Sequence, residues 1–123
     1  MNQKSIHGWF DELCLALPGA SKSNKPERDA TCYTVGGIAY ALYETAKNGK
    51  PIISLKFDPA FGDLLRQQYK VLAPGHYMEK EHWNSLCLEN EVPDDVIENL
   101  VFESHQFVFQ SLSKKIRNEL LGI

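Results

Sequence analysis

Two turn signals in the first half of the chain restrict its possible folds more than any other feature of the sequence. Gly36-Gly37 and Asn48-Gly49 each lie between segments rich in β-branched, aromatic and other apolar residues. Glycine and asparagine accept the positive φ angles of tight hairpin turns, so each pair predicts a reversal of the chain. We therefore expect three consecutive antiparallel strands, over residues 31–35, 38–43 and 51–57.

Helical signals occur on both sides of these strands. Ser5 can cap a first helix, which ends where the segment 17–20 (LPGA) brings in proline and glycine. Asp58-Pro59 has the pattern of an N-cap followed by proline in the first turn, and it predicts a short second helix that ends near Gln68.

The remaining segments complete an α+β pattern. We expect a loop over the polar stretch 21–29, a long helix from about Pro93 to Leu112, a short helix after Ser113, and two more strands, at residues 70–74 and 82–89. The predicted order is α-β-β-β-α-β-β-α. Because hairpins imply antiparallel pairing and helices must cover a sheet face, we predict a two-layer α+β sandwich, with residues 1–123 as a single domain.

Composition and charge exclude several classes of protein. The longest apolar run, 38–43, is far shorter than the roughly 20 residues that span a bilayer, and the N-terminus lacks the pattern of a signal peptide. The separated cysteines, Cys14, Cys32 and Cys87, are typical of reduced thiols, so we expect a cytoplasmic protein without membrane contact. The net charge of −3 argues against general nucleic-acid affinity, but the charge is uneven: Lys and Arg exceed acids over 20–70, and acids dominate 79–103.

The side chains do not form a recognisable catalytic or metal-binding pattern. His76, Glu79, His82 and Cys87 are of ligand type, but alternation along the predicted strand places His82 and Cys87 on opposite faces. The sequence has no G-x-S-x-G elbow, no Gly-rich phosphate loop and no H-E-x-x-H motif. We therefore expect no metal, no cofactor and no enzymatic activity.

Nucleic-acid binding has some support from the residues. Lys47 and Lys50 flank the second hairpin turn, and Lys56 lies beside Ser54 on the outer face of the third strand. Such a tip can rest on phosphates, and Trp83 can stack on bases if its side chain is exposed. The alternative is that Trp83 packs in the core and the lysines only solubilise a sheet edge.

The last long helix carries two aromatic residues away from its predicted core stripe. Phe102 and Phe109 are seven residues apart and share a helix face. Either the C-terminal residues Ile116, Leu120 and Leu121 fold back over them, or the two rings form an interface for self-association or for a partner protein. The sequence leaves both interpretations open.

Four short motifs, in their order and spacing, are similar to those of the MmcQ/YjbR family of small bacterial proteins: LPGA (17–20), SLK (54–56), EKEHW (79–83) and VPDDVIENLVFES (92–104). The resemblance implies an α-β3-α-β2-α fold of the CyaY-like or secretion-chaperone-like type. It also implies DNA binding through a double-wing arrangement. The matching positions are Pro18, Gly19, Ser54, Leu55, Lys56, Lys80, His82 and Trp83, of which Lys56, Lys80 and His82 could touch a phosphate.

The chain also departs from the family pattern. Ile38 stands where a basic residue is frequent, Ser104-His105 replaces a Ser-Tyr pair, and Ser113 replaces a proline. Two functional hypotheses follow. The first is a DNA-binding domain that uses Lys47, Lys50, Lys56, Lys80, His82 and Trp83. The second is a protein-interaction or chaperone-like module that uses the sheet or the Phe102/Phe109 face.

Overall fold

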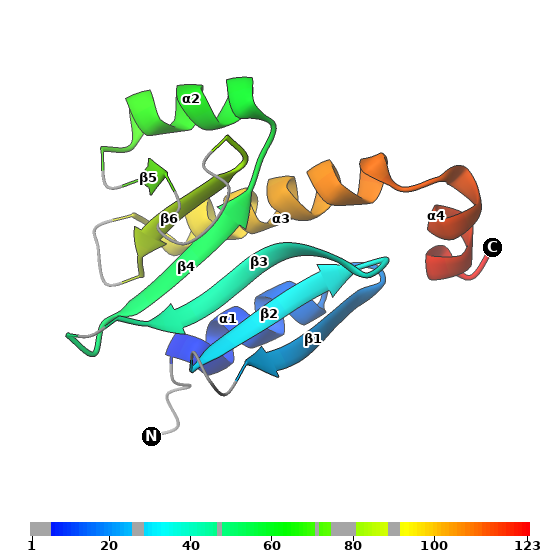
Figure 1. Cartoon of the computed structure of the whole chain (residues 1–123), viewed down its shortest axis with the longest axis horizontal. Helices are drawn as coiled ribbons and strands as arrows, with labels where there is room; N and C mark the ends of the chain where they lie inside the picture. The colour runs from blue at the N-terminus through cyan, green and yellow to red at the C-terminus, as the bar shows by residue number, and fades with distance from the viewer. Residues whose placement is uncertain (1–5, 26–28, 47, 71, 75–80, 89–91) are drawn as a thin grey trace.

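A six-stranded antiparallel sheet, in the order β1-β2-β3-β4-β6-β5, forms one layer of the protein, and helices pack against it (Figure 1). The computed structural model describes residues 6–25, 29–46, 48–70, 72–74, 81–88 and 92–123. The elements in chain order are α1 (Ile6–Leu15), β1 (Ala20–Lys25), β2 (Ala30–Val35), β3 (Ile38–Thr45), β4 (Pro51–Lys56), α2 (Pro59–Gln68), β5 (Ala73–Pro74), β6 (Trp83–Cys87), α3 (Asp94–Ser111) and α4 (Lys114–Leu121).

The predicted hairpins and the second helix are confirmed. Gly36 and Gly37 have φ angles of 59° and 82°, and Gly49 has 83°, as tight reversals between β2, β3 and β4 require. At the start of α2 the Asp58 carboxylate accepts hydrogen bonds from the backbone N–H groups of Ala60 and Phe61, at 3.1 and 3.4 Å. Local turn and cap chemistry therefore sets these element boundaries.

The expectation of a loop over 21–29 is wrong for its first part. All six residues of β1, Ala20–Lys25, pair with β2. The strand has no apolar alternation because it forms an edge of the sheet, where polar and lysine side chains are common. Its stability comes from pairing and from contacts to other elements, such as the ion pair between Lys22 and Asp11 of α1. Neither is visible in local sequence.

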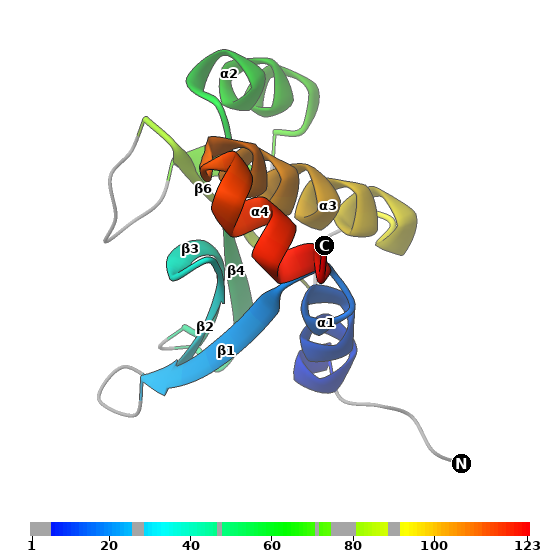
Figure 2. The same ribbon diagram turned by 90° about the vertical axis from the view of Figure 1, so that its right-hand side faces the viewer.

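The helices lie on one side of the sheet (Figure 2). α3 packs against β2, β3 and β4, α1 packs against β1, and Arg66 of α2 hydrogen-bonds to Asn84 on the same side of β6. A bulge between Tyr33 and Thr34 lets Tyr40 of β3 join this side, where its hydroxyl donates to the Cys14 carbonyl at 2.9 Å. The core residues with no exposed surface include Phe10, Tyr33, Val35, Ile53 and Val101.

None of the helices in the described part of the chain lies on the opposite side, which we call the open face of the sheet (Figure 2). Strand alternation and register place on it Ile52, Ser54 and Lys56 of β4, and Trp83, Ser85 and Cys87 of β6. The sequence did not show which face of β6 is buried. In the structure, Asn84 and Leu86 lie on the helix side of the sheet, and Trp83 lies on the open face.

The two phenylalanines of α3 do not form one exposed pair. Phe109 is buried, and its ring stacks on that of His105, whereas Phe102 is 45% exposed. The turn after α1 covers the C-terminal part of this helix face, because the Pro18 carbonyl lies 2.8 Å from His105 Nε2. The prediction of a shared exposed surface is therefore wrong for Phe109. Leu120 of α4 lies against Gly19 of the same turn.

Candidate functional site

Lys56 and Trp83 are direct partners across β4 and β6 on the open face. Lys56 Nζ lies 6.0 Å from the centroid of the indole ring, at the outer limit of a cation–π contact. Both side chains are half-buried, so Trp83 keeps part of its ring accessible and does not belong to the core. Two positions of the family motifs, SLK and EKEHW, thus meet at one end of the open face.

His82 lies on the other side of the sheet from Lys56. Its ring stacks on Phe107 of α3, with centroids 5.8 Å apart, and its carbonyl accepts a hydrogen bond from the Phe57 N–H at 2.8 Å. Lys56 and His82 therefore do not converge on one phosphate. Lys80, the third candidate, lies outside the described residues.

The lysine of the hairpin tip is remote from this pair. Lys50 is exposed in the turn between β3 and β4, where its N–H donates to Asn48 Oδ1 at 3.0 Å. Lys47 lies outside the described residues. Five residues of extended strand separate Pro51 from Lys56, or about 17 Å at 3.3 Å per residue. Of the described candidates, Lys50 thus lies at one end of β4, and Lys56 and Trp83 lie at the other.

A row of small and apolar side chains crosses the middle of the open face. Register places its members directly opposite one another on successive strands, and we call it the central row: Ser23, Cys32, Leu42, Ser54, Ser85 and Ala73. Ser54 Oγ and Ser85 Oγ are 2.7 Å apart and share a buried hydrogen bond. Leu42, Ser54 and Ser85 in the middle of the row are buried, with 4%, 3% and 7% of their surface exposed.

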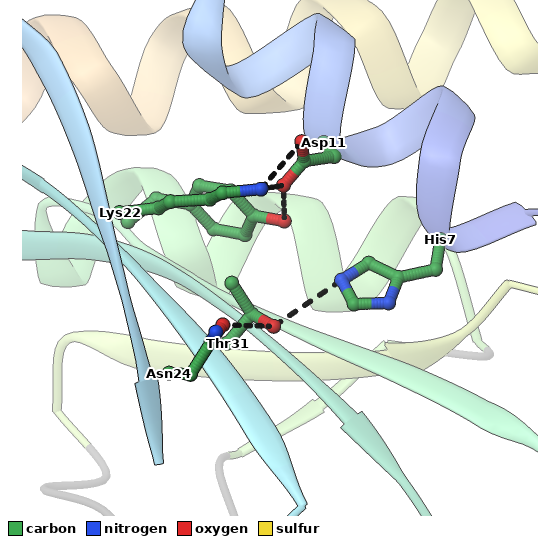
Figure 3. A network of polar contacts seen from close by, with 6 residues as sticks. His7, Asp11, Lys22, Asn24 and Thr31 are labelled. Carbon is green, nitrogen blue, oxygen red and sulfur yellow. Dashed lines mark hydrogen bonds and ion pairs between the residues drawn. The ribbon is translucent and has the colours of Figure 1, made fainter. Parts of the chain in front are cut away.

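A polar network that the sequence did not reveal joins α1 to the first two strands (Figure 3). Both carboxylate oxygens of Asp11 accept from Lys22 Nζ at 3.0 Å, and Tyr33 Oη donates to Oδ1 at 2.9 Å. Partial burial raises the pKa of Asp11, but the bonds from Lys22 and Tyr33 outweigh it, so the pKa lies below 3.8. Burial and the neighbouring carboxylate raise the pKa of Tyr33. The phenol therefore stays protonated and donates.

The second part of the network contains His7 at the start of α1. His7 Nε2 lies 3.2 Å from Thr31 Oγ1, which donates to Asn24 Oδ1 at 3.5 Å (Figure 3). The imidazole stacks flat on Tyr43, with centroids 4.1 Å apart and planes 5° from parallel. A hollow of about 210 Å³ adjoins these residues. Asn24 lies beside Thr31 because the two residues pair across β1 and β2. The sequence did not predict β1 and therefore did not predict this contact.

The described residues contain no group of three His, Cys, Asp or Glu side chains placed to hold a metal ion. His76 and Glu79, which the sequence put forward as possible ligands, lie outside them. All three cysteines are described, and none forms a disulfide. Burial raises the pKa of the Cys14 thiol, which makes it a poor nucleophile. No helix in the described part of the chain is long and apolar enough to cross a membrane.

The antiparallel sheet with helices packed on one side defines a small α+β domain. A family model described as YjbR matches residues 15–107, and the chain belongs to the YjbR family. The uncharacterised protein YjbR of Escherichia coli K12 is 33% identical over 112 residues, which cover 91% of this chain and 94% of that protein. The uncharacterised YbdF of Escherichia coli O157:H7 is 29% identical over 115 residues, 94% of this chain and 93% of that one.

Solved structures share the fold. The crystal structure of Deinococcus radiodurans protein DR2400 superposes with a TM-score of 0.79 at 28% identity, and the match covers 90% of this chain and 84% of that one. A Pseudomonas syringae crystal structure gives 0.67 at 22% identity over 84% of this chain and 97% of that one, which bears on the fold alone. The α+β fold and the family expected from the sequence are thus confirmed.

Proposed function

We propose that this chain is a non-enzymatic binding domain that holds an extended segment of a partner polypeptide on its open face. Trp83 carries the proposal. It is half-buried on the open face, beside the central row and directly opposite Lys56. A partly exposed tryptophan is a frequent anchor in protein interfaces.

The charge of the open face favours a polypeptide over a polyanion. Among its described side chains, Glu44 and Lys56 are the ones that carry formal charge, and their signs are opposite. A surface that binds duplex DNA usually gathers several cations, because much of its affinity comes from the phosphates.

A linear-peptide library displayed on phage and selected on the immobilised domain tests this proposal. Selected peptides, labelled with a fluorophore, should bind in solution. Trp83→Ala should lower their affinity about tenfold or more, as expected for an anchor residue. Phe102→Ala on α3 is the matched control, since it removes an exposed aromatic ring from the helix layer. If no peptide depends on Trp83, or if both variants have the same effect, the open face is not the site.

Duplex DNA is the second candidate, and one observation favours it. The β1–β2 and β3–β4 connections lie at the same end of the sheet, because Lys25, Ala30, Glu44 and Ile52 are successive partners across the four strands. Two such tips could act as paired wings, and their sequences contain Lys25, Arg28, Lys47 and Lys50.

Fluorescence anisotropy with a labelled duplex separates the two candidates. DNA binding by the tips would appear at low salt and fall with a log–log slope of about −0.9 for each phosphate contacted. Lys47→Ala/Lys50→Ala would reduce the slope by about two contacts. The peptide proposal predicts no duplex binding even at low salt, and Lys56→Ala serves as the corresponding test for the other end of the sheet.

A further inference from the structure

The hollow beside His7 lies on the helix side of the sheet, so it is separate from the open face. It is lined by residues from the start of α1 and from the neighbouring ends of β1, β2 and β3. The residues that line it with polar or aromatic groups are His7, Asn24, Asp29, Thr31, Tyr43 and Thr45. Its volume of about 210 Å³ suits a ligand of only a few heavy atoms.

The hydrogen bonds at the hollow determine which groups can accept. Thr31 Oγ1 uses its proton to donate to Asn24 Oδ1, so it accepts from His7, whose Nε2 must carry the ring proton. In the neutral ring, His7 Nδ1 is then an acceptor. The Asp29 carboxylate and the Thr45 hydroxyl add acceptor capacity to the lining.

The charge of the lining also favours a cation over an anion. Among the described residues that line the hollow, Asp29 is the one with a fixed formal charge, and none is a lysine or an arginine. The Lys22 ammonium nearby is held by both oxygens of Asp11. A donor-rich cation would therefore find a carboxylate and a ring nitrogen, whereas an anion would be repelled by Asp29.

From this geometry we infer that the hollow binds a small organic cation, a primary ammonium group on a short polar chain. The ammonium donates to the Asp29 carboxylate and to His7 Nδ1. The stacked rings of His7 and Tyr43 form the wall against which the short chain packs. The hydrogen bond with Thr31 and the stack on Tyr43 hold the His7 ring in place before the ligand arrives.

Three probes of nearly equal size and different charge test this inference: ethanolamine, ethylene glycol and glycolate. Each is titrated into the ¹⁵N-labelled full chain at constant ionic strength, and the amide resonances of Asn24, Ala30 and Thr31 are followed. Ethanolamine should shift them saturably, with a Kd of about 1–10 mM, the range expected of a very small ligand. Ethylene glycol and glycolate should leave them unchanged.

Asp29→Asn is the decisive variant. Asp29 has a φ of 49°, in the left-handed region that asparagine accepts as readily as aspartate, so the change removes the charge without straining the turn. It should weaken the binding of ethanolamine at least tenfold, whereas Asp95→Asn should not, because Asp95 is an exposed acid of α3 that is not among the residues lining the hollow. Equal shifts with all three probes, no shift with any, or full binding by Asp29→Asn would each overturn the inference.

Discussion

The imidazole of His105 and the carbonyl of Pro18 join the middle of α3 to the turn after α1, with 2.8 Å between Nε2 and the oxygen. His105 has no exposed surface, and its ring contacts Tyr40 edge-on and stacks on Phe109. The Gln106 amide lies 3.3 Å from Nδ1. The neutral ring, with its proton on Nε2, satisfies both contacts: Nε2 donates and Nδ1 accepts.

Because of this histidine, the free energy of unfolding should decrease as the pH is lowered. Burial lowers the pKa of His105 below 6.5, although the bond to Pro18 partly opposes the shift. Below pH 6.5 the unfolded chain then binds a proton that the folded chain excludes, so the free energy of unfolding decreases as pH falls. Each unit by which the pKa is lowered corresponds to about 1.4 kcal/mol.

Urea unfolding across this pH range, with NMR titration of the ring, measures the effect. His105→Gln keeps an N–H that can reach the Pro18 carbonyl but cannot titrate. It should therefore flatten the pH dependence below pH 6.5. A ring that titrates at or above 6.5 in the folded protein would show that its burial does not control the pKa.

Tyr33→Phe should destabilise the fold by about 1–2 kcal/mol, because it removes a half-buried hydrogen bond to a carboxylate. The phenol donates to Asp11 Oδ1 at 2.9 Å. The depressed pKa of Asp11 makes its contribution present above pH 3.8 and lost as pH falls through the folded-state value. Chemical denaturation should therefore show that Tyr33→Phe lowers the free energy of unfolding less in acid than at neutral pH. An effect that is independent of pH would contradict the proposed pairing.

Ser54 and Ser85 should behave as a coupled pair. Either Ser→Ala change leaves the other hydroxyl buried with its partner removed, at a cost of about 1–2 kcal/mol. The double variant removes both groups and should cost less than the sum, with a coupling energy of about 1 kcal/mol. A double-mutant cycle by chemical denaturation measures this term, and strict additivity would argue against a shared hydrogen bond.

Neighbouring glycines in the β2–β3 turn should differ in their tolerance of alanine. Both have positive φ, but a Cβ on Gly36 would lie 2.7 Å from Leu112 Cδ1, whereas a Cβ on Gly37 would meet nothing within 4 Å. Gly36→Ala should cost about 1–3 kcal/mol more than Gly37→Ala, since it must also displace a buried leucine. Thermal melts of the two variants compare backbone strain alone with strain plus overpacking. Equal losses would mean that Leu112 moves freely.

Turn and cap chemistry made much of this fold predictable. Gly36-Gly37, Asn48-Gly49 and Asp58-Pro59 act within a few residues of themselves, so a single sequence reveals them. β1 could not be found in this way, because its polar residues become a strand only by pairing with β2. The burial of Phe109 was hidden for a similar reason, since the turn at Pro18 that covers this part of α3 is remote in sequence.

The candidate sites were less predictable than the fold. Lys56 and Trp83 were identified by motif, but their direct pairing depends on the register of β4 against β6. The same register turns His82 to the opposite side, against Phe107. The central row also arises only when six strands align, and its members come from distant parts of the chain.

Site-specific photo-crosslinking in living bacteria tests the central claim most directly. Thr34→p-benzoylphenylalanine places the probe on the open face, and Glu103→p-benzoylphenylalanine places it on the exposed side of α3. The account predicts discrete adducts from position 34 that are sensitive to protease, resistant to nuclease and lost on Trp83→Ala. Nuclease-sensitive adducts, or the same polypeptides captured from position 103, would contradict it.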